Sequence, residues 1–251
     1  MKALITGASS GIGRDMAVML GNMGYDIYAV ARRTERLEEL KKEIKSEVHP
    51  ICADLSREEE CYRLYETVKD EGIDIFINNA GFGAFGKFCD IPLEREIDMI
   101  NLNVKSMHIL FKLFLNDFLK NNHGYIMNVA SSAGFMMGPL LATYYATKSY
   151  VLRLTQAVAK EIKKDGKNVC VSALCPGPVN TEFDSVANVR FSLKGLSSKY
   201  VAKYAINKMF AGKTVIIPGA KMKLAIGFSH IVPDGILSEI TYRCQHKKET
   251  K

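Results

Sequence analysis

The sequence predicts an α/β fold with a doubly wound parallel sheet of about seven strands and helices on both faces. Short β-rich runs alternate along the chain with longer amphipathic segments, and this alternation is typical of βαβ crossovers. Several of the short runs are almost continuously apolar, as expected for strands that are buried on both faces of a sheet. Because 251 residues can bury a sizeable core, we expect residues 1–251 to form a single domain.

The short apolar runs locate the expected strands, and the amphipathic segments between them locate the expected helices. In chain order, strands are expected at Lys2–Thr6, Asp26–Ala31, Val48–Cys52, Ile73–Asn78, Gly124–Ala130, Asn168–Leu174 and Thr214–Ile217. The longest helices are expected at Thr34–Glu47, Ser56–Asp70, Leu93–Leu119 and Tyr144–Asp165.

Charge is distributed unevenly along the chain. The formal net charge is +7, but residues 1–186 hold 22 Lys and Arg against 24 Asp and Glu, whereas the last 65 residues hold 12 against 3. The chain is therefore a nearly neutral body with a basic C-terminal quarter, which argues against a nucleic-acid-binding protein. A content of 47% hydrophobic and 24% charged residues excludes a disordered or fibrous chain.

The cysteine and histidine pattern indicates a cytoplasmic protein without a metal site. The six cysteines form no CxxC pair, and the five histidines have no HExxH spacing. The apolar stretch at the N-terminus is too short for a signal peptide. No apolar run approaches the roughly 20 residues that a membrane-spanning helix needs.

A glycine-rich segment follows the first expected strand and precedes a helical stretch. It has the sequence TGASSGIG at 6–13, with GxxxGxG spacing rather than that of a P-loop. Glycines let the backbone approach a pyrophosphate, and a helix N-terminus offers N–H donors to it. The alternative is a tight strand–helix turn without a ligand. We expect a Rossmann-type dinucleotide site contacted by Gly7, Ser9, Ser10, Gly11, Ile12 and Gly13.

The end of the second strand indicates which dinucleotide is preferred. NAD-binding sites place an Asp or Glu there, whereas this chain has Ala31 followed by Arg32 and Arg33. A guanidinium can pair with a 2′-phosphate, so NADP(H) is expected to be preferred over NAD(H). The alternative is that both arginines simply begin a charged helix.

A further cofactor contact is expected after the third strand. Asp54 and Leu55 would flank the adenine ring. Asp54 could equally be the N-cap of the next helix, with Ser56 as a rival for that position.

Tyr144 and Lys148 form a candidate acid–base pair. They stand four residues apart at the start of an expected helix, so their side chains share one face. An ammonium group beside a phenol favours the phenolate and should lower the tyrosine pKa from about 10 towards neutrality. A general acid or base that acts on an alcohol or carbonyl oxygen needs this property. Alone, such a pair is common on solvated helix faces.

Five motifs occur in register along roughly the first 185 residues. They are TGASSGIG at 6–13, Asn-Asn-Ala-Gly at 78–81, Ser131 thirteen residues before Tyr144, the Tyr144/Lys148 pair, and Pro176-Gly177 after the sixth strand. Together they resemble the short-chain dehydrogenase/reductase family, in its branch of about 250-residue single-domain enzymes. The resemblance covers residues 1–185 as the cofactor-binding and catalytic core, and it weakens beyond them.

The resemblance implies a catalytic tetrad. Tyr144 would donate a proton to a substrate carbonyl during reduction, and Lys148 would hold the nicotinamide ribose. Ser131 would hydrogen-bond the substrate oxygen, and Asn103 would kink its helix and hold a water that links Lys148 to solvent. The adjacent Tyr145, Ser132 and Asn101 are the lesser candidates, because they lack the family spacing.

The resemblance also implies the remaining cofactor contacts. Asn79, Ala80 and Gly81 would pack against the adenine ribose and close the central sheet. The nicotinamide would be lined by Pro176, Gly177, Val179 and Thr181, together with Tyr144 and Lys148.

The substrate side is expected to be apolar. Segments rich in Phe and Met follow the cofactor motifs, and residues 182–212 are expected to form a substrate loop or lid. Such side chains favour an apolar carbonyl compound or alcohol, although any one of them could simply pack a surface loop. The expected pocket residues are Phe82, Phe85, Met136, Met137, Leu140 and Phe183.

Residues 218–251 form a basic, apolar tail that departs from the better-known family pattern. The tail could cover the pocket, contact an anionic membrane peripherally, form a partner interface, or be a solvated helix with one apolar face. The family implies a homo-oligomer, a dimer or a tetramer, although the unusual tail puts the tetramer in doubt.

The expected function is therefore an NADP(H)-dependent oxidoreductase that reduces a ketone or aldehyde, or oxidises the matching alcohol, without a metal. One alternative is a 3-ketoacyl-thioester reductase, for which the basic tail could meet an acidic carrier protein. An alternative of another class is a non-catalytic sensor of NADP(H) occupancy that regulates a partner.

Overall fold

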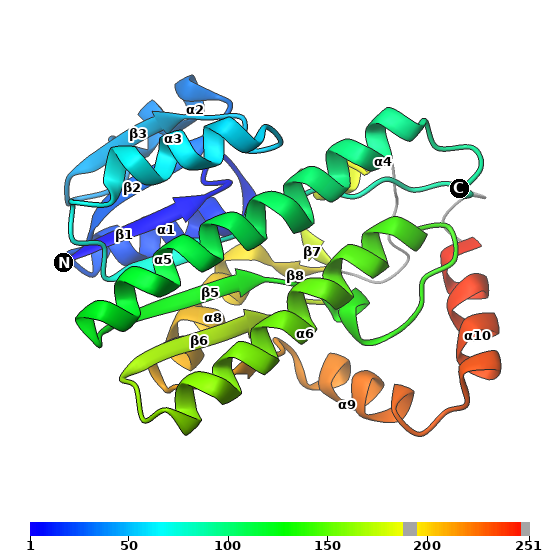
Figure 1. Cartoon of the computed structure of the whole chain (residues 1–251). Coiled ribbons are helices and arrows are strands. Elements are labelled where there is room, and N and C mark those ends of the chain that lie inside the picture. Colours follow the sequence, from blue (N-terminus) through cyan, green and yellow to red (C-terminus); the bar gives the residue numbers. More distant parts are fainter. Residues whose placement is uncertain (188–194, 247–251) are drawn as a thin grey trace.

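The computed structural model describes residues 1–187 and 195–246. Its central sheet has seven parallel strands in the order β3-β2-β1-β4-β5-β6-β9, with helices on both faces (Figure 1). The α/β prediction is therefore confirmed, including the number of strands in the sheet. The strands are β1 (Lys2–Thr6), β2 (Asp26–Ala31), β3 (Val48–Cys52), β4 (Ile75–Asn78), β5 (Gly124–Val129), β6 (Val169–Leu174) and β9 (Val215–Ile216).

The helices and two further short strands connect and flank this sheet. β7 (Val179–Asn180) and β8 (Leu196–Ser197) pair with each other in a separate parallel sheet. The helices are α1 (Gly11–Asn22), α2 (Thr34–Leu40), α3 (Glu58–Val68), α4 (Leu93–Ile100), α5 (Met107–Asn121), α6 (Ala142–Lys164), α7 (Phe183–Val186), α8 (Ser198–Phe210), α9 (Ala220–Ser229) and α10 (Asp234–His246). A π-helix, η1 (Asn101–Ser106), joins α4 to α5, and a 3-10 helix, η2 (Ser132–Phe135), follows β5.

Two hydrophobic cores lie on opposite faces of the sheet. One is shared with α1, α2 and α8, and the other with α3, α5 and α6. Leu4 and Ile5 are successive residues of β1, and they lie in different cores because side chains alternate along a strand. This explains why the strands are nearly continuous apolar runs in the sequence. Figure 1 shows α5 and α6 in front of the sheet and α1 behind it.

Two expected helices differ from the structure. The helix expected at Thr34–Glu47 ends at Leu40, because the amides of residues 41–43 bond to carbonyls three residues back and form a tight turn instead. The helix expected at Leu93–Leu119 is interrupted by η1, where the backbone inserts a π-helical segment. β1, β2 and β3 have the expected bounds, and the other strands of the central sheet end within one or two residues of expectation.

The segment expected as a substrate loop, residues 182–212, has two different parts. Its first part contains α7, and residues 188–194 lie outside the described residues. Its second part is α8, whose side chains Val201, Ala205 and Ile206 are fully buried in the core shared with α1. Apolar residues at helical spacing are the signal that could have identified α8 as a core helix.

The tail forms α9 and α10, which extend along one side of the molecule (Figure 1). Met222 of α9 lies against Gly177, and Nε2 of Gln245 in α10 donates to the Tyr145 hydroxyl over 2.7 Å. The tail therefore packs beside the loops at the carboxyl ends of the strands. Residues 247–251 lie outside the described residues.

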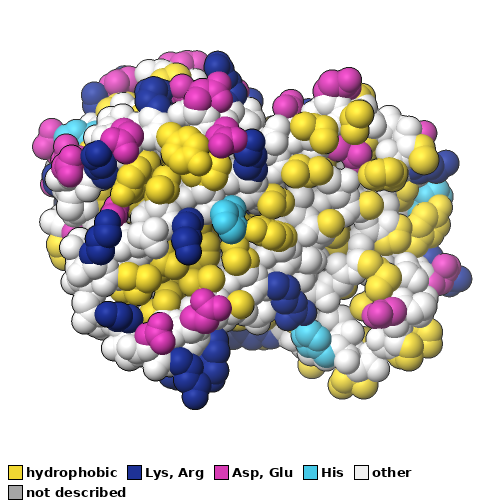
Figure 2. Space-filling view, viewed as in Figure 1, with side chains coloured by type: hydrophobic (Ala, Val, Ile, Leu, Met, Phe, Trp, Pro, Cys, Tyr) yellow, Lys and Arg dark blue, Asp and Glu magenta, His cyan; other side chains and the backbone are white. Residues whose placement is uncertain are grey.

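The outward face of the tail exposes large apolar side chains among its charged ones. Leu224, Phe228 and Ile231 are exposed, and Figure 2 shows hydrophobic side chains on this corner of the molecule. Within the parts of the chain that the structure describes, no helix is long and apolar enough to cross a membrane.

Candidate active site

The glycine-rich segment between β1 and α1 forms a tight cradle at the carboxyl edge of the sheet. Gly7 has a φ of +67°, in the left-handed region that favours glycine. A Cβ atom on Gly13 would collide with the Asn79 side chain and with the Gly7 carbonyl oxygen. The backbone is therefore accessible at the helix N-terminus, where a pyrophosphate can accept hydrogen bonds, so these residues fit a dinucleotide.

Asn79 and Thr6 join the ends of β1 and β4. Nδ2 of Asn79 donates to the Thr6 carbonyl over 2.8 Å, and the Thr6 hydroxyl accepts the amides of Asn79 and Ala80 at 2.9 and 3.0 Å. Thr6 is part of the glycine-rich motif, but the sequence did not indicate a separate role for it. Its hydroxyl fixes the distance between the glycine cradle and the segment that leads to Gly81.

The two arginines after β2 have different environments. The Arg32 side chain is exposed, whereas Nη2 of Arg33 donates to the Ser9 hydroxyl over 3.2 Å and so reaches the glycine cradle. The same nitrogen donates to Oε2 of Glu182 over 2.7 Å. Arg33 is thus the arginine that the structure brings to the cofactor motif, and Glu182 is a partner that the sequence analysis had not assigned.

Neither expected cap of the helix after β3 acts as one. The N-cap residue of α3 is Arg57, and it makes no side-chain capping bond. Oδ1 of Asp54 instead accepts the Ser56 amide at 3.2 Å and the Ser56 hydroxyl at 2.9 Å. Asp54 thus stabilises the turn that follows β3, and Leu55 is buried beside it.

Lys148 is the lysine of the candidate acid–base pair. It is buried, and its Nζ donates to the Val129 carbonyl over 2.8 Å at the end of β5. Burial lowers the pKa of Lys148 to about 8, because desolvation disfavours the ammonium form. The ammonium nitrogen lies 5.9 Å from the ring centroid of Tyr144.

The pKa of Tyr144 shifts in the direction opposite to the sequence expectation. Desolvation raises it to about 12, and a hydrogen bond with the Ser131 side chain opposes this only in part. The expected lowering by Lys148 is therefore wrong for this structure, because burial is the main cause of the shift and the Lys148 ammonium is not among its causes. At neutral pH the Tyr144 side chain is a phenol, which is the form that can donate a proton.

Ser131 begins η2. Its hydroxyl accepts the Ala133 amide at 3.1 Å, and this bond fixes the side chain at the start of the 3-10 turn. The Ser132 amide instead donates to the Pro176 carbonyl over 2.8 Å and so links the ends of β5 and β6.

Asn103 lies in the π-helix η1 and is almost fully buried. Its Oδ1 accepts the Phe82 amide at 3.1 Å, and its Nδ2 donates to the Phe82 carbonyl over 2.8 Å and to the Thr147 hydroxyl over 3.1 Å. A Cβ atom on Gly81 would lie 2.8 Å from Asn103 Oδ1 and 3.3 Å from Lys148 Nζ. The structure therefore brings Asn103, Gly81 and Lys148 together.

The segment after β6 crosses to the glycine cradle. Pro176 is buried, and Val179 begins β7. A Cβ atom on Gly11 would lie 3.0 Å from Cγ2 of Thr181. The Thr181 hydroxyl accepts the Phe183 amide at 3.2 Å, so it stabilises the start of α7.

Of the expected pocket residues, Phe183 is the one in ring contact with Tyr144. The centroids of Phe183 and Tyr144 are 5.3 Å apart. Phe82 and Phe85 are half-buried, and the Phe82 ring lies 5.2 Å from the Arg95 guanidinium carbon.

The other three expected pocket residues lie between η2 and α6. Leu140 is buried with a φ of +64°, an uncommon conformation for a leucine, and its carbonyl accepts the Gly86 amide at 2.9 Å. Met136 is half-buried and Met137 is exposed. Their assignment to the substrate stays a prediction.

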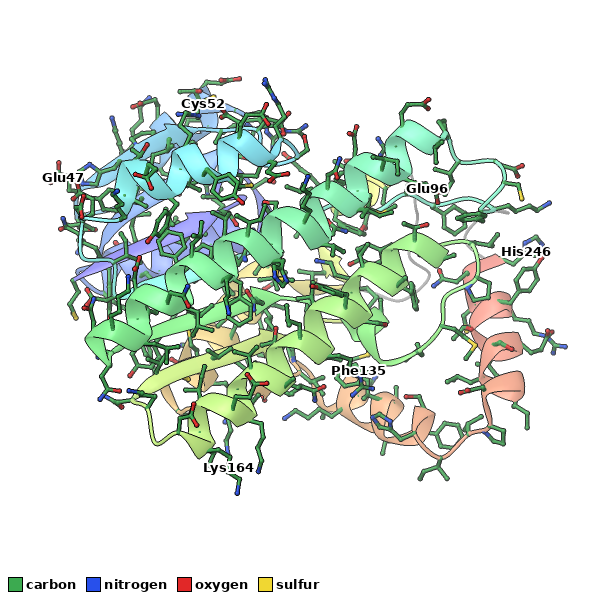
Figure 3. All side chains as sticks on the ribbon, in the orientation of Figure 1. Glu47, Cys52, Glu96, Phe135, Lys164 and His246 are labelled. Atoms are coloured by element: carbon green, nitrogen blue, oxygen red, sulfur yellow. The ribbon has the colours of Figure 1, made fainter. Side chains whose placement is uncertain are left out.

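Glu96 is a buried carboxylate that the sequence analysis missed. It lies on α4 and accepts the Thr143 hydroxyl at 2.7 Å, beside the first turn of α6 (Figure 3). Thr143 directly precedes Tyr144, so Glu96 supports the turn that carries the tyrosine. Phe135 of η2 faces α9 in the same view, with its ring 6.0 Å from that of His230.

Comparisons with known proteins agree on one family. A family model described as short chain dehydrogenase matches residues 1–189. An uncharacterized oxidoreductase of Staphylococcus epidermidis is 35% identical over 182 residues, which cover 71% of this chain and 78% of that protein.

Solved structures have the same fold. A short-chain dehydrogenase from Sphingobium yanoikuyae in complex with NADPH is 30% identical with a TM-score of 0.82, covering 87% of this chain and 88% of that one. A bulky-bulky ketone specific alcohol dehydrogenase from Comamonas testosteroni is 27% identical with a TM-score of 0.77, covering 91% of both chains.

Proposed function

Because this chain belongs to the short-chain dehydrogenase family, we propose that it is an NADP(H)-dependent oxidoreductase that reduces an apolar ketone or aldehyde, or oxidises the matching alcohol. The observation that carries the proposal is the meeting of four side chains at the carboxyl edge of the sheet. Tyr144 lies beside Ser131 and Lys148, and Asn103 lies beside Lys148 across Gly81.

Each of these side chains has a defined task in the proposed reaction. Tyr144, a phenol with a pKa of about 12, donates its proton to the carbonyl oxygen in the reductive direction. The Ser131 hydroxyl donates a hydrogen bond to the same oxygen as negative charge develops on it. Lys148 in its ammonium form holds the cofactor ribose. A bound nicotinamide supplies or accepts the hydride.

The preference for NADP(H) rests on the end of β2. Ala31 offers no carboxylate to a ribose 2′-hydroxyl, and Arg33 extends a guanidinium towards the Ser9 side of the glycine cradle. The complex of the Sphingobium relative with NADPH supports this preference.

The substrate class rests on the side chains near Tyr144. The Phe183 ring contacts the Tyr144 ring. Leu140, which shortly precedes α6 in the chain, is buried. The Comamonas relative, described as specific for bulky-bulky ketones, supports an apolar carbonyl substrate. We also infer a cytoplasmic location, because all six cysteines are free thiols, as a reducing compartment favours.

A screen of NADPH consumption tests the proposal. Aldehydes, α-diketones, ketosteroids and 3-ketoacyl thioesters are offered to the full chain with NADPH and, in parallel, with NADH. Turnover of a ketone or aldehyde with NADPH supports the proposal. Turnover of thioesters alone favours the ketoacyl reductase, and NADPH binding without turnover of any compound favours the sensor.

Tyr144→Phe removes the proposed proton donor and keeps the ring. We expect kcat to fall by about 10²- to 10⁴-fold, since this is the usual contribution of a general acid, with the Kd for NADPH changed only a few-fold. Tyr145→Phe is the matched control, because its hydroxyl bonds to Gln245 on the tail, and it should retain most activity. Carbonyl reduction by Tyr144→Phe at the unmodified rate would refute the proposed mechanism.

A further inference from the structure

Glu182 holds the arginine that is proposed to bind the cofactor. Oε2 of Glu182 accepts from Arg33 Nη2 at 2.7 Å, and its Oε1 lies 3.7 Å from Nη2 of Arg36. The hydrogen bond from Arg33 holds the pKa of Glu182 below its ordinary value, so the carboxylate is ionised at neutral pH. The pair joins the β2–α2 connection to a segment 149 residues later.

A carboxylate and a phosphate present similar oxygen acceptors to a guanidinium. Both form charge-assisted, often bidentate bonds with arginine. Nη2 of Arg33 already divides its donors between Glu182 and the Ser9 hydroxyl at the glycine cradle. A phosphate that binds Arg33 through Nη2, on the side of the glycine cradle, must therefore take a donor that Glu182 holds.

We propose that Glu182 competes with the 2′-phosphate of NADP(H) for Arg33 and is thereby a specificity-determining residue of this enzyme. The inference rests on the proposed preference for NADP(H). NAD(H), which has no 2′-phosphate, leaves the Arg33–Glu182 pair in place. Glu182 therefore weakens the binding of NADP(H) and leaves that of NAD(H) unchanged.

The position of Glu182 couples this competition to the catalytic residues. Thr181 on one side of it lies against Gly11 of the glycine cradle, and Phe183 on the other side contacts the Tyr144 ring at 5.3 Å. Three successive residues thus contact the cofactor cradle, the selectivity arginine and the catalytic tyrosine. Release of Glu182 by a phosphate removes one contact of the segment that carries Phe183.

The expected effect of Glu182 on NADP(H) affinity depends on how exposed the Arg33–Glu182 pair is. The side chains of Arg33 and Glu182 are 42% and 39% exposed, so water and salt screen their attraction. The competition is therefore worth at most roughly fivefold in affinity, as measured for exposed ion pairs. It adjusts the preference between the two cofactors and does not create it.

Calorimetric titration of NADPH and NADH tests the competition. Glu182→Gln should lower the Kd for NADPH by about two- to fivefold and leave the Kd for NADH unchanged. Glu39→Gln on α2 is the control, since it removes the same charge from an exposed position near Arg36. An equal Kd for NADPH in the two variants would overturn the proposal.

An Arg33→Ala background separates competition from direct repulsion. If Glu182 acts through Arg33, adding Glu182→Gln to Arg33→Ala changes the Kd for NADPH no further. If Glu182 simply repels the phosphate, the gain is the same with and without Arg33, and the proposal is overturned.

The same background distinguishes failure of this inference from failure of the proposed function. If Arg33→Ala leaves the ratio of NADPH to NADH affinity unchanged, the proposed cofactor preference is contradicted. The proposed competition then fails as well. If Arg33→Ala lowers this ratio but Glu182→Gln has no effect on it, only the proposed competition is contradicted.

A fluorescent reporter tests the coupling to α7. The chain contains no tryptophan, so Val186→Trp, at an exposed position of α7, gives a single emission signal. Adenosine 2′,5′-bisphosphate should change this emission, and adenosine 5′-monophosphate at equal saturation should not. Equal responses to the two nucleotides would overturn the coupling. An unchanged Kd for NADPH shows that the reporter variant binds normally.

Discussion

At the residue scale, burial has opposite consequences for the two central side chains. It lowers the pKa of Lys148 to about 8, because the charged form is the acid, and it raises the pKa of Tyr144 to about 12, because the charged form is the base. The spacing in the sequence predicted that the two would be neighbours. It could not predict the direction of the tyrosine shift, because the extent of desolvation depends on side chains that arrive from other elements.

These values predict the pH dependence of carbonyl reduction. Between about pH 8 and 12 Tyr144 remains a protonated donor, whereas Lys148 loses the charge that is proposed to hold the ribose. We expect kcat/KM for NADPH to be constant below about pH 8 and to fall above it by up to about tenfold per pH unit, as for loss of one essential proton.

The measurement is a series of initial rates from pH 6 to 10 at a saturating concentration of carbonyl substrate. The Kd for NADPH at each pH serves as the control, and it should rise over the same range. A kcat/KM that stays constant up to pH 10 would contradict the role given to the Lys148 charge.

At the element scale, the π-helix η1 is the feature that apolar periodicity did not predict. The pattern of Leu93–Leu119 indicates one continuous helix, because one inserted residue hardly alters the spacing of apolar side chains. The kink entered the sequence analysis only through the family resemblance of Asn103. In the structure, Asn103 lies in the π-helix, and its side-chain amide binds both backbone groups of Phe82.

Asn103→Ala should therefore weaken both stability and activity. The change leaves the amide and carbonyl of Phe82 without their partners, which typically costs about 1–3 kcal/mol in the free energy of unfolding. Urea denaturation measures this loss, and steady-state kinetics should show a lower kcat, because Asn103 lies beside Lys148 across Gly81.

Asn101→Ala is the matched control on the same π-helix. Asn101 is half-buried, so we expect its replacement to change the free energy of unfolding by no more than about 0.5 kcal/mol. Equal losses of unfolding free energy in the two variants would mean that the bonds from Asn103 to Phe82 do not cause the loss.

At the scale of the whole molecule, the family motifs end before the last helices and strands of the fold. The resemblance located the site up to about residue 185, yet α8 and β9 complete the core and the sheet beyond it. Of the roles left open for the tail, the contacts of Met222 with Gly177 and of Gln245 with Tyr145 favour a cover on the substrate side. Membrane contact and homo-oligomer formation stay predictions.

The outward face of the tail provides a test of membrane contact. Phe228 and Ile231 lie within the basic C-terminal quarter and are 60% and 82% exposed, so we expect the full chain to sediment with anionic lipid vesicles. Replacing both residues by serine should abolish this association and preserve the fold, since neither side chain is buried. Vesicles of neutral lipid are the control. A full chain that remains unbound with anionic vesicles would contradict the prediction.

The strand order also has a consequence for synthesis on the ribosome. β1 to β4, which frame the glycine cradle, emerge before β5 and β6, and β1 can pair on both sides as soon as Ile75–Asn78 has left the exit tunnel. The outer edge of β6 has no partner until Val215–Ile216, which follows β6 only after α8, has also been synthesised. A nascent chain that stalls between these points exposes an unpaired parallel strand, which is a template for pairing with other chains. Slow codons in that interval would therefore lower the yield of folded protein without changing a single amino acid.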